Sequence, residues 1–321
     1  MSLGLLDQVR AAAKEVAARA TYVHIDEDSI PAYVASLSMA QAHSPQLDAR
    51  YHYLGHPNEI VAYIITLDAI NFGSGYFPQL RKRSNLSGYF TIASCLKDYF
   101  ETQGAFTARK LSRLTAKDCA EIFGQNLDAE PVKELMGLFA SALNDLGKYL
   151  LDRYNGEFVD LVNAAESSAE RLVQLLAKMP YFRDVEQYDG LEVPFYKRAQ
   201  LTAADLSLAL GNQGFGFFND LHRLTIFADN LVPHVLRVDG ILKYEEKLAE
   251  RIDAGELIPS GSPEEIEIRA SAVHAVELMV EELRNQGKRV SAIKLDYLLW
   301  NRGQHPDYKA RPRHRTRTVF Y

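Results

Sequence analysis

Apolar residues recur at helical spacing along most of this chain, and the longest such run constrains the fold most. Between Pro131 and Tyr154, leucine, phenylalanine, alanine and tyrosine residues lie three or four positions apart, which places them along one face of an α-helix. Gly156 follows the run and suits the end of that helix. Because a helix with a long apolar face must be covered by other elements, the rest of the chain has to supply partners for it.

Similar spacing predicts further helices on both sides of this run. Pro57 precedes one apolar run, Gly104 follows another, and Thr115 with Asp118 forms a capping-box pattern, all signals of helix ends. The predicted helices cover residues 58–72, 88–103, 115–123, 131–154, 167–178, 196–210, 220–228, 233–238, 244–253, 263–286 and 291–301, and the short strand candidates cover 22–25, 191–195 and 318–321. We therefore predict a mainly α fold, with a single compact helical domain over residues 1–321 and at most a few short strands.

Composition narrows the class of protein. The hydrophobic share of 47% and the charged share of 24% are typical of a globular chain, and the net charge of −6 disfavours a protein that holds long nucleic acid by its phosphates. Cys95 and Cys119 form no CxxC pair, which argues against a disulfide framework or a thiolate zinc site. The first twenty residues form an amphipathic helix and not a signal peptide, and the longest apolar stretch, 60–67, is far too short to span a membrane. A soluble, cytoplasmic protein is expected.

Standard catalytic signatures are absent from the sequence. It has no GxxxxGK[ST] loop, no GxGxxG after a strand, no HExxH and no GxSxG, which disfavours nucleoside-triphosphate, dinucleotide and serine-hydrolase chemistry. The histidines are scattered, and groupings such as Asp220 with His222 lack a ligand triad. We expect neither a metal nor a cofactor.

Four segments place polar or aromatic residues where a plain helical bundle does not need them. They are 67–72 with Asp68, Asn71 and Phe72; 195–200 with Lys197 and Arg198; 218–233 with Asp220 and Asp229; and 295–300 with Trp300. Each has a structural interpretation: the acidic residues can be helix caps or polar helix ends, the paired cations a solvated face, and the tryptophan part of the core. Taken together they suggest a nucleotide pocket, with aromatic rings to stack a base, amide and carboxylate groups for its edge and a cation for phosphate.

The same segments carry a resemblance to a known family. The stretches LDAINF (67–72), LSGYF (86–90), VPFYKRAQLTAAD (193–205), FNDLHRLTIFADNLVP (218–233), ILKY (241–244), EIEIRA (265–270), LDYLLW (295–300) and HRTRTVFY (314–321) resemble the queuosine-salvage proteins in the same order, from about Asp48 to the C-terminus. The resemblance implies a queuosine 5′-phosphate N-glycosylase that releases queuine. It also implies an α-helical fold with distant similarity to helical DNA glycosylases.

Carried over residue by residue, the resemblance puts the catalytic carboxylate at Asp229 of the Phe-Ala-Asp block. Such a carboxylate stabilises the positive charge that develops on ribose as the C1′–N bond breaks. A 7-deazaguanine has carbon in place of N7, so hydrogen bonds to the base edge should matter for its departure. Candidates for substrate binding are Asp68, Asn71 and Asp220 at the base edge, Phe72 and Trp300 for stacking, and Lys197, favoured over Arg198, for the phosphate.

Two other functions stay open at this point. A base-excision-type glycosylase acting on DNA or tRNA would also be helical with a catalytic aspartate, but it predicts a basic footprint that the composition lacks. A non-catalytic protein that binds queuine or its nucleotide would need the pocket but not Asp229. The expected partner is a small-molecule nucleotide, queuosine 5′-monophosphate, with no stable nucleic-acid binding and no membrane.

Overall fold

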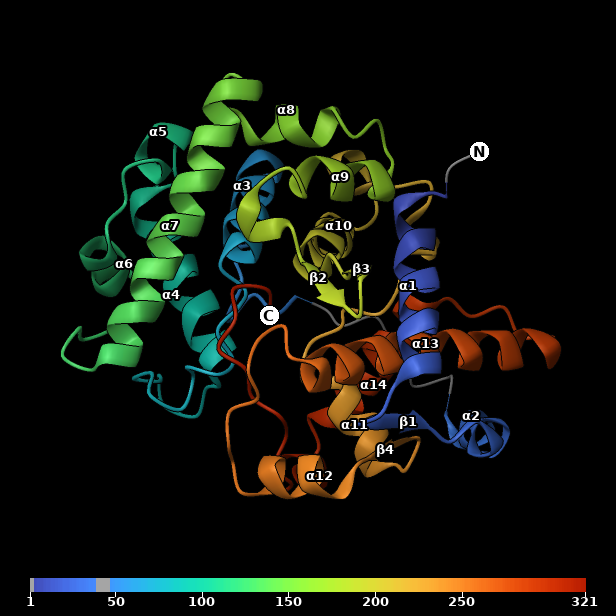
Figure 1. Cartoon of the computed structure of the whole chain (residues 1–321). Coiled ribbons are helices and arrows are strands. Elements are labelled where there is room, and N and C mark those ends of the chain that lie inside the picture. Colours follow the sequence, from blue (N-terminus) through green and yellow to red (C-terminus); the bar gives the residue numbers. More distant parts are fainter. Residues whose placement is uncertain (1–2, 39–46) are drawn as a thin grey trace. The chain divides into compact units, whose positions relative to one another are not determined.

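Helices make up most of the chain in the computed structural model, which describes residues 3–38 and 47–321 (Figure 1). Backbone contacts divide the chain into two units, each built from separate segments: unit 1 comprises Met1–Pro45, Asp184–Lys197 and His222–Arg317, and unit 2 comprises Gln46–Arg183, Arg198–Leu221 and Thr318–Tyr321. The mainly α prediction is confirmed. The single-domain prediction and the likeness to DNA glycosylases stay predictions.

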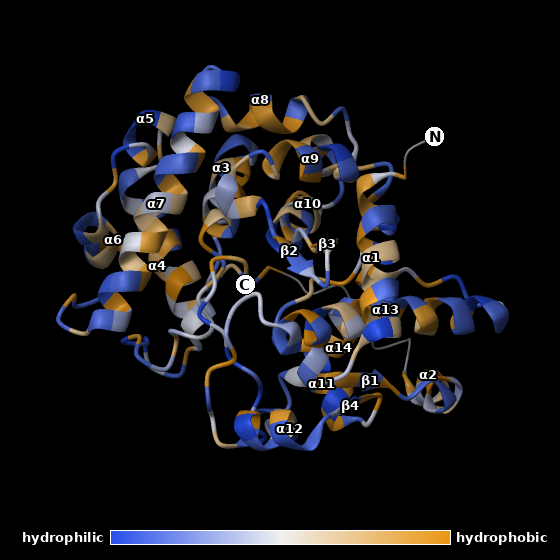
Figure 2. Cartoon of the chain, in the orientation of Figure 1, coloured by the Kyte–Doolittle hydropathy of each residue, from blue (hydrophilic) through white to orange (hydrophobic). Residues whose placement is uncertain are grey.

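Unit 2 is organised around its longest helix. This helix, α7 (Glu130–Arg153), contacts several of the others, and Figure 2 shows apolar and polar residues alternating along it. Its buried side includes Leu135, Phe139 and Leu146, as the spacing predicted. The other helices of unit 2 are α3 (Pro57–Ala69), α4 (Gly88–Gln103), α5 (Ala108–Leu111), α6 (Ala116–Ile122), α8 (Phe158–Asn163), α9 (Ala169–Leu176) and α10 (Lys197–Ala209), whose first residue belongs to unit 1.

Unit 1 is built on a second long helix. This helix, α13 (Pro263–Asn285), packs against α1 (Leu5–Arg19), and its buried residues lie at the centre of one apolar core. The remaining helices are α2 (Ile30–Ser36), α11 (Val232–Val238), α12 (Glu246–Asp253), α14 (Ala292–Gly303) and α15 (Pro306–Lys309). Two small antiparallel sheets complete the described part of this unit: β1 (Val23–Ile25) pairs with β4 (Leu242–Tyr244), and β2 (Val185–Tyr188) pairs with β3 (Leu191–Pro194).

Two predicted elements are wrong, for a common reason. Residues 220–228 hold only a 3-10 turn at Leu221–Arg223, and residues 318–321 form no strand. In both segments side chains take the backbone groups that a regular element would pair: Arg269 binds the Ala228 carbonyl, and Arg198 binds the Val319 carbonyl. The strand β3 lies within the predicted strand 191–195, and Asp189 and Gly190, with φ of 45° and 78°, supply the two-residue turn that joins it to β2.

The predicted helix ends were more accurate. The helix α4 spans the predicted residues 88–103, and Thr115 and Asp118 form the reciprocal capping box at the start of α6. These ends depend on hydrogen bonds between residues a few positions apart, which a sequence displays directly.

Two glycines of α7 allow a matched test of packing in unit 2. A Cβ at Gly147 would meet the Ser112 amide and lie 2.5 Å from the Ala108 carbonyl oxygen, whereas a Cβ at Gly137 has no atom within 4 Å. We expect Gly147→Ala to lower the free energy of unfolding by about 1–3 kcal/mol, because the backbone of α5 has to move.

Gly137→Ala is the control for helix propensity. It should raise the free energy of unfolding by up to about 1 kcal/mol, since alanine is the better helix former. Denaturant titration of both variants measures the difference, and equal effects would contradict the close approach at Gly147.

Candidate functional site

A buried segment without regular structure leads to the predicted catalytic residue in unit 1. Residues 224–228 are buried, yet they form neither helix nor strand. Asp296 Oδ1 accepts the Phe227 amide at 2.9 Å, and Arg269 Nε donates to the Ala228 carbonyl at 2.9 Å. Because a buried backbone group without a partner costs free energy, these two side chains make the irregular path possible.

Asp229 follows this segment and is half-buried. Its Oδ1 accepts the amides of Leu231 at 2.7 Å and Val232 at 3.3 Å, and Leu231 is the N-cap position of α11 without a side-chain cap of its own. The carboxylate thus binds the amides at the start of α11, which fixes its orientation. Asp229 therefore does bind the start of the next helix, as the capping interpretation expected. Its carboxylate is held where solvent can still reach it.

Asp296 brings a second carboxyl group to this region. The residue lies on α14 with 3% of its surface exposed. Burial raises the pKa of Asp296 well above its usual value; the amide of Phe227 opposes that shift, the charge of Asp229 adds to it, and Lys197 opposes it. The two carboxyl groups therefore differ in their surroundings: Asp296 is buried, which favours its neutral form, and Asp229 is half-buried.

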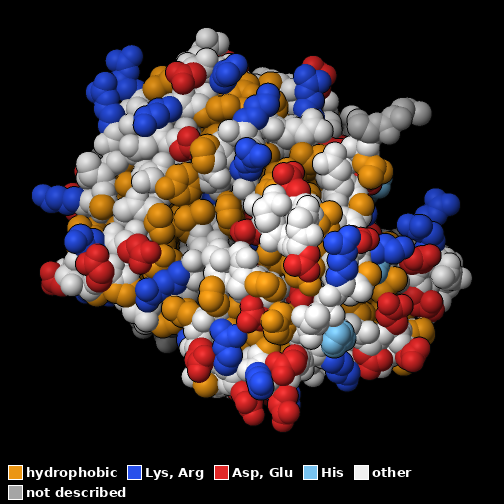
Figure 3. Space-filling model, in the orientation of Figure 1, with side chains coloured by type: hydrophobic (Ala, Val, Ile, Leu, Met, Phe, Trp, Pro, Cys, Tyr) orange, Lys and Arg blue, Asp and Glu red, His pale blue; other side chains and the backbone are white. Residues whose placement is uncertain are grey.

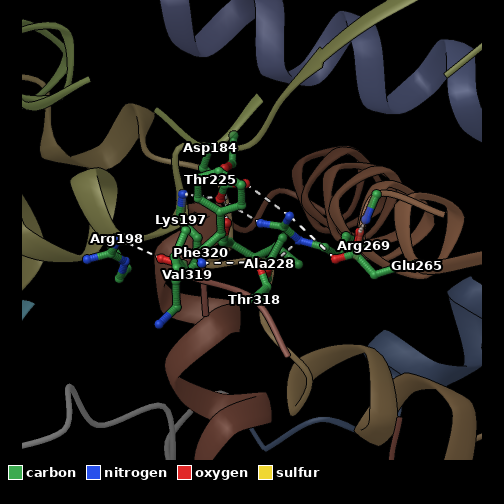
Figure 4. A network of polar contacts seen from close by, with 12 residues as sticks. Asp184, Lys197, Arg198, Thr225, Ala228, Glu265, Arg269, Thr318, Val319 and Phe320 are labelled. Carbon is green, nitrogen blue, oxygen red and sulfur yellow. Dashed lines mark hydrogen bonds and ion pairs between the residues drawn. The ribbon is translucent and has the colours of Figure 1, made fainter. Parts of the chain in front are cut away.

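Arg269 belongs to a network of polar contacts with Asp184, Glu265 and the Ala228 carbonyl (Figure 4). It is fully buried, binds both carboxylate oxygens of Asp184 at 3.0 and 2.6 Å and lies 3.6 Å from Glu265. Its guanidinium also stacks 3.9 Å from the centre of the Phe195 ring. A planar guanidinium in bidentate contact sets direction as well as distance. Through its bond to the Ala228 carbonyl, the same side chain holds the residue that precedes Asp229.

Lys197 is held by the same network. Its backbone amide donates to Asp184 Oδ2 at 3.0 Å, and its side chain is 5% exposed, with a charge that lowers the pKa of Asp296. The preceding residue, Tyr196, has a φ of 49°, a left-handed conformation that is strained for a non-glycine residue and recurs at functional sites. The structure thus brings Lys197 close to the carboxyl pair.

Two further residues of unit 1 lie near the pair. Trp300 is half-buried and stands one turn after Asp296 on α14, which places both on the same side of that helix. Arg313 interacts with the charge of Asp229, while burial lowers the pKa of its own guanidinium. Arg313 forms no ion pair among the described residues.

In unit 2, Arg198 has a structural role. It is 2% exposed and donates to the carbonyls of Asp68, Ala69, Tyr181 and Val319. The choice of Lys197 over Arg198 for the phosphate is consistent with this use of the guanidinium.

Phe72 lies in the core beside Arg198. Its ring is 1% exposed, lies 4.9 Å from the Arg198 guanidinium and meets Phe139 edge-on at 5.2 Å. The ring already has partners on the inside of unit 2, and its predicted stacking on a base stays a prediction.

Asp68 and Asn71 lie at the end of α3 in unit 2. Asp68 is fully buried and its Oδ1 accepts from Asn71 Nδ2 at 3.4 Å. Its charge, with that of Asp205, adds to the burial that raises the pKa of Tyr63 and Tyr89. A buried acidic and phenolic cluster of this kind is suited to hydrogen bonding, and the base-edge role of Asp68 and Asn71 stays a prediction.

Asp220 binds the start of α9 in unit 2. One carboxylate oxygen accepts the Ala169 amide at 2.6 Å, and the other accepts the Ser168 hydroxyl at 2.7 Å and the Glu170 amide at 3.2 Å. Both oxygens therefore bind the first turn of α9, whose N-cap residue is Ser168, and Asp220 does not cap a helix of its own, because only a 3-10 turn follows it.

The sequence reasoning missed Asp296, Arg269, Asp184 and Arg313. Asp296 lies within LDYLLW, where only the tryptophan was considered. A single acidic residue in an otherwise apolar helix is the sequence feature that could have identified Asp296. Arg269 lies within EIEIRA (265–270), and all six of these residues are buried in α13. The charged side chains of this segment therefore have no side of the helix that faces solvent. Charges in a helix with no polar face indicate partners from other segments.

Residues 3–38 and 47–321 hold neither a metal-binding group of side chains nor a membrane-spanning helix. No group of three or more histidine, cysteine, aspartate or glutamate side chains there is arranged to hold a metal ion. No helix in that part of the chain is long and apolar enough to cross a membrane.

A mainly helical chain with two carboxyl groups in one region, one buried and one half-exposed, has the kind of groups that a glycosyl hydrolase uses. The sequence model of the family described as queuosine salvage protein matches residues 51–321. The chain belongs to this family.

Similar proteins carry one name. A protein of Sphaerobacter thermophilus named queuosine 5′-phosphate N-glycosylase/hydrolase is 37% identical, over 99% of this chain and 98% of its own length. Proteins of the same name from Bos taurus and Dictyostelium discoideum are 31% and 33% identical, over 97% and 81% of this chain and 98% and 77% of their own lengths. The resemblance found in the sequence motifs is confirmed.

The contacts of Asp220 predict a stability effect. Asp220→Ala should lower the free energy of unfolding by about 1–2 kcal/mol, because three donors of the first turn of α9 lose their acceptor. Denaturant titration measures the loss. Asp152→Ala, which changes an exposed aspartate on α7, should change stability by less than about 0.5 kcal/mol. Unchanged stability of the Asp220 variant, together with weaker substrate binding, would favour the base-edge role instead.

Proposed function

We propose that this protein hydrolyses the N-glycosidic bond of queuosine 5′-phosphate and releases queuine for salvage. The observation that carries the proposal is the position of Asp229, whose carboxylate is oriented by two backbone amides beside the neutral Asp296. Family membership and the shared name of the relatives supply the substrate class.

In this mechanism Asp229 faces the ribose. As the C1′–N bond breaks, its electron pair leaves with the base and positive charge develops on the sugar, where a nearby carboxylate stabilises it. Water then supplies a hydroxyl group to C1′, and its remaining proton balances the departing base. Because one oxygen of Asp229 is already bound by amides, little reorganisation is needed when the charge appears.

In this proposal Asp229 is the only one of the two carboxyl groups that carries a negative charge. Two ionised carboxylates in one buried region repel each other, and burial of Asp296 removes that conflict by favouring its neutral form. The neutral acid still accepts the Phe227 amide, so it positions the segment that leads to Asp229.

The other substrate-binding roles belong to the same proposal. Lys197 interacts with Asp296, and Trp300 stands on the same side of α14 as Asp296, which supports the substrate-binding role proposed for both. We assign Asp68, Asn71 and Phe72 of unit 2 to the base. The predicted contact of Lys197 with phosphate stays a prediction.

A small nucleotide is the proposed partner. Acidic and basic side chains are interspersed on the face drawn in Figure 3, where the described residues form no continuous basic area, and the net charge is −6. A phosphate-binding surface for DNA or tRNA would require a basic excess. We place the reaction in the cytoplasm, since Cys95 and Cys119 are free thiols, the usual state in that compartment.

Asp229→Asn tests the catalytic assignment. It keeps an oxygen for the amides of Leu231 and Val232 but removes the charge, so we expect queuine release to fall by at least about 1,000-fold, with substrate binding retained. Purified protein is incubated with queuosine 5′-phosphate, and free queuine is followed by chromatography with mass detection.

Wild-type protein is the matched control in this assay. Release by the wild type and the variant at equal rates would keep the hydrolase and reject Asp229. Tight binding without release by the wild type would favour the non-catalytic binding protein.

Asp296→Asn tests the neutral acid. The pKa of Asp296 is raised in the folded protein, so the folded state binds more protons than the unfolded state above the ordinary aspartate pKa, and stability is lost as the pH rises. The amide imitates the neutral acid and keeps the acceptor for Phe227. We therefore expect the variant to lose less stability than the wild type as the pH rises above the ordinary aspartate pKa of about 4.

Activity at neutral pH should survive in this variant to within about tenfold, because a neutral group still binds the Phe227 amide. Asp296→Ala is the comparison: without the acceptor it should lose both stability and activity. An inactive Asp296→Asn variant with normal stability would mean that Asp296 acts as a proton donor or as an ionised group. Unfolding at several pH values and the release assay measure both properties.

A further inference from the structure

A cavity lined by basic side chains lies beside α11 in unit 1. Its volume is about 180 Å³, and its lining includes His234 and Arg237 from α11 with Arg311 from the C-terminal segment. The one carboxylate in the lining, Asp253, is paired with Arg237 at 2.9 Å. Nothing in the proposed function uses this cavity.

His234 leaves a polar atom without a partner here. Its ring is 2% exposed, and Nε2 lies 2.8 Å from the Tyr308 carbonyl oxygen. A carbonyl only accepts, so Nε2 carries the proton and the neutral ring has an acceptor at Nδ1. Within the described residues Nδ1 has no hydrogen-bond partner. A buried ring nitrogen in this state is unusual and is explained when a ligand completes it.

The charges around His234 are nearly all positive. Burial lowers the pKa of the ring, and Arg313, Arg237 and Arg311 lower it further, while its bond to Tyr308 opposes them. Arg311 is exposed and forms no ion pair or side-chain hydrogen bond in the described part of the chain. Cations that repel one another around a cavity lose that repulsion when an anion occupies it.

We propose that this cavity binds a phosphate group through Arg311, Arg237 and His234. Guanidinium groups match the oxygens of a phosphate in geometry and charge. The P–OH of a phosphate monoanion donates to Nδ1, or Nδ1 takes up that proton and donates to the dianion, so either form satisfies the ring.

Two phosphates fit this chemistry, inorganic phosphate and the 5′-phosphate of the nucleotide. Arg313 interacts electrostatically with both regions: its charge lowers the pKa of His234, and it interacts with the charge of Asp229. The nucleotide version rests on the proposed function, and it assigns the 5′-phosphate to Arg311 in place of Lys197, which interacts with Asp296.

Calorimetry with inorganic phosphate, at an ionic strength matched with chloride, tests the site without any turnover. We expect Arg311→Gln to weaken phosphate binding about tenfold or more, and Arg237→Gln to weaken it as well. Arg113→Gln is the control, because Arg113 is also exposed, lines another basic cavity and has no ion pair among the described residues. Arg311 is exposed, so its replacement should leave folding intact.

Kinetics with two substrates separate the sources of phosphate. A tenfold higher KM of Arg311→Gln for queuosine 5′-phosphate, with an unchanged KM for queuosine, identifies the nucleotide as the source. Weaker phosphate binding with both KM values unchanged supports the site and identifies free phosphate. In the same assay Lys197→Gln should reduce kcat on both substrates.

Two results would overturn the site. Phosphate binding by Arg311→Gln and Arg237→Gln that equals the wild type removes it, and so does an equal loss in Arg113→Gln, which would reduce the effect to general charge. An inactive wild type would reject the proposed hydrolase and leave the calorimetric result to decide this site.

Discussion

The ion pair between Arg269 and Asp184 is the interaction on which the rest of unit 1 depends. Both residues are buried and bind each other through two parallel hydrogen bonds. Arg269 also holds the Ala228 carbonyl, while Asp184 holds the Lys197 amide. Breaking such a buried pair costs about 3–5 kcal/mol because one charge is left without compensation. The pair therefore sets the positions of the segments before Asp229 and at the start of α10 together.

The Arg269–Asp184 pair also connects three of the sequence motifs in space. The segments PFYKR, IFAD and EIEIRA lie far apart in the sequence, and each contributes a group to the surroundings of Arg269: the Phe195 ring and Lys197 amide, the Ala228 carbonyl, and Glu265. A guanidinium with five donors needs a complete set of acceptors when it is buried. Changing one motif without the others would leave part of that set unsatisfied.

Contacts between residues close in the sequence could be predicted from it, whereas contacts between distant residues could not. The ends of α4 and the capping box of α6 were predicted because their hydrogen bonds join residues a few positions apart. The predicted helix at 220–228 was wrong because Asp296 and Arg269, far along the chain, bind its backbone instead. The candidate site divides in the same way: motif resemblance pointed to Asp229, while Asp296 became visible only from its burial beside that residue.

The catalytic role proposed for Asp229 is compatible with its structural role at the start of α11. The amides of Leu231 and Val232 fix one oxygen of the carboxylate, so the group is oriented before any substrate arrives. A carboxylate oriented by side chains alone would lose rotamer freedom on binding, and that cost would reduce its effect on the transition state. A short helix preceded by an aspartate is therefore a means of holding a reactive charge in place, and its cap-like sequence pattern is a consequence of that geometry.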